Sequence, residues 1–225
     1  MLAGAAAFGW VMTPSGADVQ ARTAALAAIE GAQPLLQTQL APDLVSALVS
    51  TEDERFFIHH GVDALGIARA ILADLRQGCV CEGGSTITQQ LVKQVYLGGD
   101  DHGLNKLRGV FLAFKIEGRI SKRQILADYL TVTPLGYSRY GAVNASCDYF
   151  GRAPDALLLH QSALLAGMPQ APSAYDPTLH PQAALRRRAQ VLSLMRVNGN
   201  ITAAQESAAA AAPLLATGRG CQSAT

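Results

Sequence analysis

The chain has 225 residues, 49% of them hydrophobic, and its 18 Lys and Arg against 17 Asp and Glu give a formal net charge of +1. This length predicts one globular domain with at most a short appendage. The balanced charge excludes a strong overall field for wrapping nucleic acid, and also the charge excess that favours disorder. Only 6% of the residues are aromatic, whereas Ala and Leu are abundant, which favours helices packed on helices over a β-sandwich. We therefore expect a mainly α protein.

The N-terminal segment, residues 1–39, begins with an apolar run from Met1 to Met12. This run is shorter than the roughly 18–20 residues of a membrane-spanning helix, and it lacks the basic start of a secretory signal. Two interpretations stay open: a disordered or helical terminus, or the remnant of a membrane anchor whose beginning is absent from this chain. The Ala-rich residues 17–39 predict a peripheral helix.

The cysteines lack the paired C-x-x-C spacing and the matching histidines of a structural zinc site. Cys79 and Cys81 are too close in the chain to bridge to one another easily. Either one can pair with a distant cysteine, Cys147 or Cys221, in an oxidising compartment. The sequence leaves the pairing open.

Helical periodicity strengthens at Pro42, and Asp43 is expected to cap a helix there. Glu52 follows Leu48 at helical spacing, on the same side of that helix. Its carboxylate is expected to point along the buried side, where desolvation raises the pKa of a carboxylic acid toward that of a useful acid or base. The apolar stripe of this helix consists of Leu44, Val45, Leu48 and Val49.

Two further helices are predicted next along the chain. Asp63 is expected to cap the second helix. Glycines at 83–84 open the third, in which Thr86 and Gln89 have the spacing of a capping box. The residues expected to face the core are Ile67, Ile71 and Leu75 in the second helix, and Ile87, Leu91 and Val95 in the third.

The remaining pattern is also helical. Ser121 and Gln124 form another predicted capping box, and further helices are expected after Asp155, Pro181 and Thr202. No Gly-x-Gly-x-x-Gly sequence, Walker loop or strand–helix alternation occurs, so a nucleotide-binding α/β fold is not expected. A fourth helix follows the polar loop at 98–103, and its expected apolar positions are Leu104, Leu107, Phe111 and Phe114.

Charges are unequal locally although their total is balanced. The charged side chains within residues 51–63 are acidic apart from Arg55, whereas those within residues 105–123 are basic apart from Glu117. We interpret these segments as two sides of one cleft, an arrangement that suits a carboxylate-catalysed reaction on a phosphorylated substrate. A basic run is also typical of a solvated helix face, and this interpretation stays open.

Two motifs carry a family resemblance. Residues 52–61 contain E-D-x-x-F-x-x-H-x-G, and residues 83–90 contain G-x-S-T-I-T-Q-Q. With these motifs the chain resembles the peptidoglycan glycosyltransferase domain of bifunctional penicillin-binding proteins and of monofunctional transglycosylases. The resemblance extends over residues 40–213 and leaves a C-terminal tail at 214–225. It implies a two-lobed, lysozyme-like helical domain, and because no transpeptidase domain follows, we expect a monofunctional chain.

The resemblance implies polymerisation of lipid II into glycan strands, with release of undecaprenyl diphosphate. Glu52 is the expected base, and Asp53 is either a second catalytic carboxylate or a structural support. Lys93, Lys106 or a divalent metal (Mg or Mn) would offset charge on the diphosphate, and no organic cofactor is expected. The substrate-binding set is His59, Ser85, Thr86, Gln89, Gln90, Lys93 and Lys106, and the supporting set is Phe56, Lys122 and Arg187.

Within these sets, amides of a helix beginning at residues 84–86 are expected to add hydrogen-bond donors, and Gln89 and Gln90 are expected to orient sugars or phosphates. His59 is interpreted as a hydrogen-bonding support rather than a metal ligand, because no partner at ligand spacing is visible. Arg187 is expected to brace the cleft.

The chain departs from the family pattern at its third motif, R-K-x-x-E. Residues 105–109 retain only Lys106, since Asn105 and Gly109 stand where the family has its arginine and its second carboxylate. Asp101 also replaces an arginine, and Thr131 replaces an asparagine. These changes motivate an alternative: a catalytically impaired protein that binds lipid II or an assembly partner.

Two other classes are less compatible with the motifs. A lytic transglycosylase usually has Ser after the acidic residue, whereas Asp53 follows Glu52 here. A purely structural role for a helical protein does not explain the presence of the motif at 84–90. The expected partners are lipid II, the growing glycan strand, the bacterial inner membrane and cell-wall synthesis proteins, with no nucleic acid. The expected location is the periplasm or the outer face of the cytoplasmic membrane.

Overall fold

The computed structural model describes residues 10–69, 84–100 and 102–214. Within these ranges the regular elements are helices, and extended pairing is limited to isolated bridges between His60 and Val62 and between Pro134 and Tyr140. The prediction of a mainly α protein is therefore confirmed. The helices are α2 (Val19–Glu30), α3 (Pro42–Glu52), α5 (Ile87–Tyr96), α6 (Leu104–Glu117), α7 (Lys122–Val132), α8 (Ala142–Phe150), α9 (Leu159–Gly167), α10 (Pro181–Val197) and α11 (Ala203–Ala211), with short 3-10 turns η1 (Gln37–Gln39) and η2 (Pro154–Ala156).

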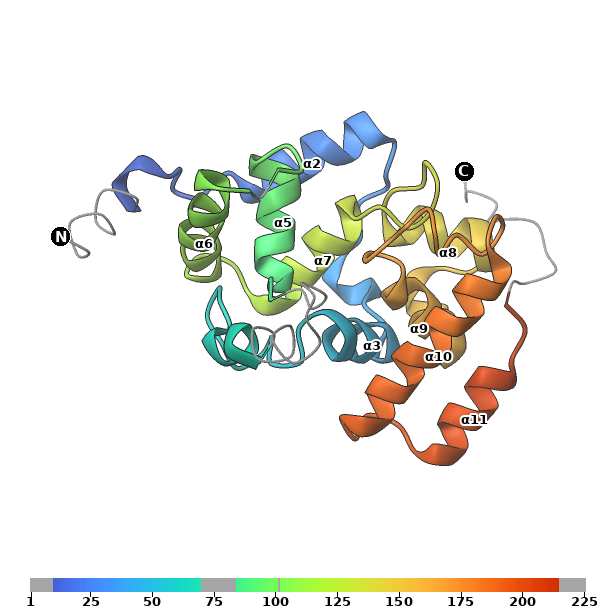
Figure 1. The fold of residues 1–225 in the computed structure, drawn as a ribbon. Coiled ribbons are helices and arrows are strands. Elements are labelled where there is room, and N and C mark those ends of the chain that lie inside the picture. The colour runs from blue at the N-terminus through green and yellow to red at the C-terminus, as the bar shows by residue number, and fades with distance from the viewer. Residues whose placement is uncertain (1–9, 70–83, 101, 215–225) are drawn as a thin grey trace.

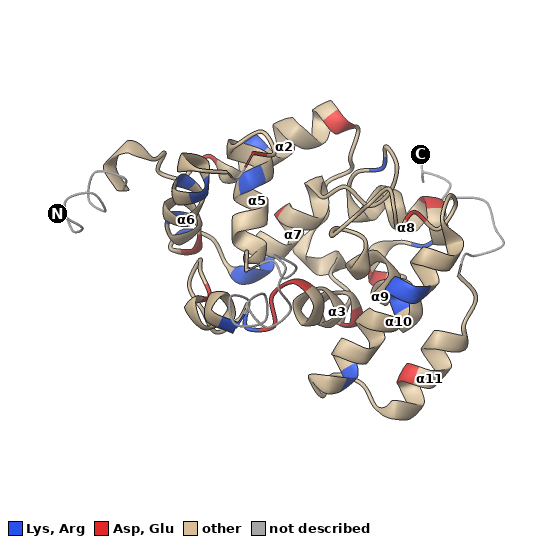
Figure 2. Cartoon of the chain, in the orientation of Figure 1, with Lys and Arg blue, Asp and Glu red and all other residues tan. Residues whose placement is uncertain are grey.

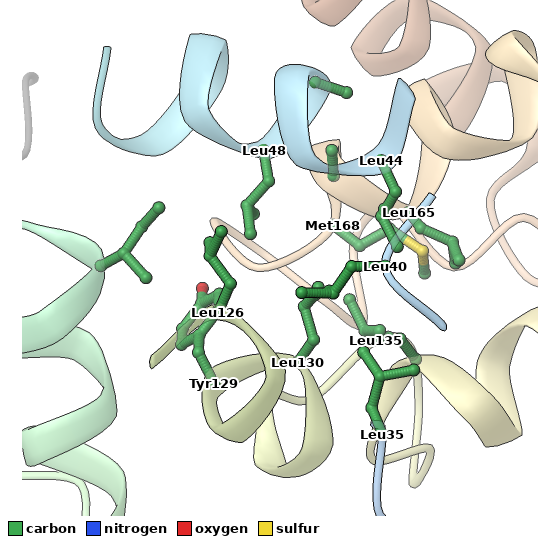
Figure 3. Packing of buried hydrophobic residues seen from close by; sticks show 14 of the residues in the cluster. Leu35, Leu40, Leu44, Leu48, Leu126, Tyr129, Leu130, Leu135, Leu165 and Met168 are labelled. Atoms are coloured by element: carbon green, nitrogen blue, oxygen red, sulfur yellow. The ribbon is translucent and has the colours of Figure 1, made fainter. Parts of the chain in front are cut away.

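Most helix contacts fall within two groups. Helices α3, α9 and α10 pack on one another and α11 packs on α10, whereas α5 packs on α6 and α7, and α2 packs on α7 (Figure 1). The hydrophobic core joins the groups, because Leu44 and Leu48 of α3 point toward Leu126 and Leu130 of α7 (Figure 3). This packing places the end of α3, and with it Glu52, beside α5 and α7.

Helix α7 is the central helix, since every residue from Ile125 to Val132 is buried. Thr131, the departure from the family asparagine, has a structural contact here. Its hydroxyl accepts a hydrogen bond from the Leu35 amide at 2.9 Å and donates one to the Ala127 carbonyl at 2.8 Å. It thus ties the segment before α3 to the central helix.

Two predictions near the N-terminus are wrong in detail. The helix expected over 17–39 is α2, which ends at Gly31 in a left-handed conformation with φ +66°. Asp43 does not cap α3, because Pro42 occupies the first helical position and Ala41 precedes it without a side-chain cap. Asp43 lies in the first turn instead, where a negative charge favours the helix dipole.

The predicted fourth helix is α6, but three of the four apolar positions that marked it are exposed. Leu104, Leu107 and Phe114 are 73%, 57% and 42% exposed. The helix instead presents a different stripe at helical spacing to the core and to α5. This buried stripe consists of Gly109, Leu112, Ala113 and Ile116.

Several predicted helix starts are confirmed. Thr86 and Gln89 form a reciprocal capping box at α5, and Thr202 caps α11. Ser121 accepts from the Gln124 amide at α7, but the Gln124 side chain bonds elsewhere, so that box is half formed. Asp63 accepts from the Leu65 amide at the start of the next helix. The rest of that predicted helix, with Ile71 and Leu75, lies outside the described residues.

Helix α10 begins at Pro181 as predicted, whereas Asp155 lies in η2 and α9 starts only at Leu159. Among the described residues, no helix has the length and apolar character needed to cross a membrane. Cys147 is disulfide-bonded, and the other cysteines lie outside the described residues.

Candidate active site

A cleft of about 1110 Å³ lies between the end of α3, the start of α5 and residues of α6, α7 and α10. Acidic residues occur at the end of α3, and basic residues on α5 and α6 (Figure 2). The prediction that the acidic and basic segments meet in one cleft is thus confirmed only in part, because Lys106 alone of the basic side chains in residues 105–123 lines it. Of the predicted site residues, those that line it are Glu52, Asp53, Ser85, Thr86, Gln89, Gln90, Lys93, Lys106 and Arg187, whereas Phe56, His59 and Lys122 do not.

Glu52 is the last residue of α3 and is half-buried in the cleft. Burial raises its pKa above the ordinary value, opposed by a hydrogen bond from Gln90 and by the charge of Arg187. Gln90 Nε2 donates to Glu52 Oε2 at 2.8 Å. A carboxylate with a raised pKa, open to a cleft, is suited to accept a proton near neutral pH.

The Asp53 carboxylate is hydrogen-bonded to His59 and to the start of α5. Both of its carboxylate oxygens lie 3.0 Å from His59 Nε2, and Oδ2 also accepts from the Ile87 amide at 3.1 Å. Burial raises the pKa of Asp53, and the adjacent His59 opposes that shift. These contacts are those of a structural support between the first motif and α5, which is the second of the two roles expected for Asp53.

His59 was expected to bind substrate, and the structure does not bring it to the cleft. The residue is 8% exposed and is engaged by Asp53. Its ring also lies edge-on to Phe56, with centroids 6.1 Å apart. His59 therefore acts as the hydrogen-bonding support that its lack of ligand partners indicated.

The start of α5 differs from the expected anion site. The helix begins at Ile87 rather than at residues 84–86, and the Ile87 amide is taken by Asp53. The Gln89 amide donates to Thr86 Oγ1, and the Thr86 amide donates to Gln89 Oε1. These amides and side chains hold the helix end itself, so they are not available for a phosphate.

Gln90 also has a role different from the expected one. Its Oε1 accepts from the Tyr129 hydroxyl at 2.7 Å while its amide group donates to Glu52. Gln90 therefore orients the carboxylate rather than a sugar. Tyr129 lines the cleft without having been predicted as a site residue, because its position in α7 gives it the pattern of a core residue.

Basic side chains line the same cleft as Glu52. Lys93 of α5 and Lys106 of α6 both line it, and Lys106 Nζ donates to Ser85 Oγ at 2.6 Å. Arg187 lines it from α10, where its Nε donates to the Gly167 carbonyl at 2.9 Å. Arg187 thus braces α10 against α9, as expected, with its charge near Glu52.

Phe56 and Lys122 form a supporting cluster behind the cleft. Lys122 Nζ lies 4.3 Å from the Phe56 ring centroid and 2.7 Å from Glu117 Oε2. Thr88 of α5 donates to the other oxygen of Glu117. The cluster connects the first motif to α5, α6 and α7, and Glu117 was missed because it reads as an isolated acid in a basic segment.

The degenerate third motif opens onto the same cleft. Asn105 and Gly109 both line it, and the Asn105 side-chain amide donates to Asp100 at 2.9 Å. A Cβ at Gly109 would meet only Leu97 Cδ1 at 3.7 Å, an ordinary contact. Glycine is therefore not required here by a close approach of another segment. Asp101 lies outside the described residues.

The described residues do not by themselves fit a resident divalent metal. No group of three or more His, Cys, Asp and Glu side chains among them could hold an ion. The carboxylates beside Glu52 are also committed, since Asp53 bonds His59 and Glu54 pairs with Arg69 at 2.8 Å.

Comparison of the sequence with known proteins identifies its family. The Transglycosylase family model matches residues 23–196. Penicillin-binding protein 1A of Escherichia coli (strain K12) is 42% identical over 172 residues, covering 76% of this chain and 20% of that protein. Penicillin-binding protein 1A of Vibrio cholerae serotype O1 is 40% identical over 182 residues, covering 81% and 22%. The chain thus spans about a fifth of the length of these relatives.

A crystal structure of penicillin-binding protein 1A from Haemophilus influenzae aligns with 44% of this chain and 15% of that chain, at 36% sequence identity and a TM-score of 0.41. The fold assignment depends on the helices described above rather than on this partial superposition. Because the family model matches well over half of the chain, the protein belongs to the transglycosylase family.

Proposed function

We propose that this chain is a peptidoglycan glycosyltransferase that polymerises lipid II and releases undecaprenyl diphosphate. The observation that supports the proposal most directly is Glu52, whose carboxylate is partly desolvated and bonded by Gln90 in a cleft that Lys93 and Lys106 also line. The relatives carry the name penicillin-binding protein 1A, and this name is compatible with the proposed role in cell-wall synthesis.

The proposed reaction requires a base and a cationic site. An acceptor sugar hydroxyl attacks the anomeric carbon of the donor, and the new C–O bond forms as the bond to the diphosphate breaks. The hydroxyl proton passes to Glu52, and the bonding electrons leave with the diphosphate. Lys93 and Lys106 are the residues that we assign to offset the negative charge on the leaving diphosphate.

The proposal includes the location and the architecture. A lipid-linked substrate places the reaction at the outer face of the bacterial cytoplasmic membrane, in the periplasm. The exposed apolar side chains of α6, together with the basic residues on that helix, agree with a site beside a lipid surface. The two groups of helices on either side of the cleft support a two-lobed, lysozyme-like arrangement.

A polymerisation assay tests the proposed function. The purified chain is incubated with labelled lipid II, with and without Mg²⁺ or Mn²⁺ and with and without candidate cell-wall partners, and glycan length is measured by gel electrophoresis. Glu52→Gln is the control, since its amide keeps the shape of the side chain but cannot act as the base. Polymer from the unaltered chain alone is the expected result, and equal polymer from both proteins would remove Glu52 from the mechanism.

The third motif favours a second candidate function. Gly109 supplies no carboxylate to the cleft, and Asn105 supplies no charge. A chain limited by these losses would bind lipid II or an assembly partner without extending a glycan. Binding of labelled lipid II with no polymer under any of the assay conditions would establish this alternative.

A further inference from the structure

Hydrogen bonds between side chains along the wall of the cleft lead to Glu52. Gln94 Nε2 donates to Thr133 Oγ1 at 3.2 Å, and Thr133 follows Tyr129 by four residues, at the end of α7. The Tyr129 hydroxyl donates to Gln90 Oε1 at 2.7 Å, and Gln90 Nε2 donates to Glu52 Oε2 at 2.8 Å. All five residues line the cleft.

The chemistry of the side chains decides which group donates and which accepts in each of these hydrogen bonds. The Tyr129 phenol has a single proton, which it gives to the carbonyl oxygen of the Gln90 side chain. The other end of that amide is NH₂, which can only donate, so it requires an acceptor at Glu52. An ionised carboxylate is the acceptor that gains most from such a bond.

We propose that Tyr129 is a positioning residue for the glycosyltransferase reaction: by fixing the Gln90 amide, it holds the Glu52 carboxylate ionised and leaves the Oε1 atom to receive the acceptor's proton. The inference rests on the proposed function and deepens it. Among the described residues, the hydrogen bond to Glu52 goes to Oε2, and Tyr129 is 0% exposed and cannot itself turn into the cleft.

The electrostatic surroundings give the sign of the effect. Burial raises the pKa of Glu52, and Asp53 adds to this rise, whereas the Gln90 hydrogen bond and the charge of Arg187 lower it. Loss of the Gln90 bond therefore raises the pKa and reduces the ionised fraction in weakly acidic solution. By element, the charged or titratable groups that act on Glu52 or line the cleft with it include Asp53 after α3, Lys93 on α5, Lys106 on α6, Tyr129 on α7 and Arg187 on α10.

The test compares two buried tyrosines. Tyr129→Phe removes the hydroxyl that fixes Gln90 and keeps the ring in the core. Tyr149→Phe is the matched control, because Tyr149 is 2% exposed and its hydroxyl lies within hydrogen-bonding distance of the Leu135 carbonyl, at 3.0 Å, and of Asp176, at 3.1 Å, away from the cleft residues. Both variants lose one hydroxyl from a buried site, and only one of them bears on Glu52.

Two readouts are measured on the full chain. The first is the titration of Glu52 by carbon NMR on protein labelled at the glutamate carboxyl carbon, with the signal assigned by its loss in Glu52→Gln. The second is the pH dependence of kcat/KM for lipid II polymerisation. For Tyr129→Phe we expect the titration and the acidic limb of the rate profile to move up by about half a pH unit or more. For Tyr149→Phe we expect neither to move.

The outcomes are distinguishable. Tyr129→Phe that titrates and reacts like the unaltered chain overturns the inference. If this variant does not fold, Gln90→Leu breaks the same chain of bonds one step nearer to Glu52, and an unchanged Glu52 titration there overturns the inference equally. An unaltered chain that makes no polymer refutes the proposed function, whereas the NMR titration still decides whether Tyr129 acts on Glu52.

Discussion

Restoring an acidic side chain at Gly109 of α6 tests both the packing and the chemistry of the degenerate motif. A Cβ at this position meets only Leu97 Cδ1 at 3.7 Å, and the glycine lines the cleft. The position is inside a regular helix, where glycine is about 1 kcal/mol less favourable than Ala and Glu is only a few tenths less favourable than Ala. Because Gly109 belongs to the buried stripe of α6, desolvation of the new carboxylate opposes this propensity gain, and we expect Gly109→Glu to fold with a Tm close to that of the unaltered protein.

The effect of Gly109→Glu on stability and its effect on the polymerisation rate differ in size, so they can be measured separately. A propensity gain of roughly 0.5 kcal/mol for Gly109→Glu corresponds to a rise in Tm of about 1–2 °C in a domain of this size. A carboxylate that contacts the transition state is expected to raise the polymerisation rate at least tenfold, or about 1.4 kcal/mol. Lys106 lies one turn earlier on α6 and also lines the cleft. An ion pair between the new carboxylate and Lys106 would reduce the increase in rate, because the carboxylate would then be less available to the substrate.

Gly109→Ala is the matched control, because it gains helix propensity without a carboxylate. We expect its Tm to rise by about 2–4 °C and its rate to stay unchanged. Thermal unfolding and lipid II turnover are measured on both variants. A fall in Tm for Gly109→Ala would refute the packing argument, and equal rates for the two variants would show that the missing carboxylate does not limit catalysis.

We expect Glu52→Gln to abolish polymerisation while shifting Tm by no more than about 2 °C, since the residue is on the cleft surface; gel assay and calorimetry check this. Lys93→Ala and Lys106→Ala should each weaken lipid II binding and flatten its dependence on salt, and unchanged affinity across a salt series would exclude both lysines from the site. Gly61→Ala should destabilise the fold by about 3 kcal/mol or more in urea unfolding. Its φ is +72° and the added Cβ would lie 2.7 Å from the Phe114 backbone nitrogen, so a stable variant would contradict this geometry.

The sequence was most informative where one local rule decides the outcome. The capping box of Thr86 and Gln89 needs only residues within one turn, and the structure forms it. The place of Glu52 followed from helical spacing alone, because α3 has one buried face and that face continues to the helix end. Local patterns are reliable in such cases because tertiary contacts agree with them.

The sequence was least informative where packing against another helix decides which of two possible faces or contacts is formed. Helix α6 has two apolar stripes, and packing against α5 buried the one with small residues, such as Gly109 and Ala113, rather than the one with Leu107 and Phe114. Tyr129 is another such case, since an aromatic residue at a core position shows no sign of the hydrogen bond that it makes to Gln90. These roles depend on residues brought together across the fold, which spacing does not encode.

The two consecutive carboxylates also determine which parts of the molecule can move. Because Asp53 is hydrogen-bonded to the first amide of α5, the end of α3 and the start of α5 are expected to behave as one rigid block. Thermal motion that widens the cleft must then displace α6 or α10 relative to this block. The distance between Glu52 and Gln90 is expected to stay constant during such motion, so the hydrogen bond that orients the Glu52 carboxylate would be kept while the width of the cleft changes.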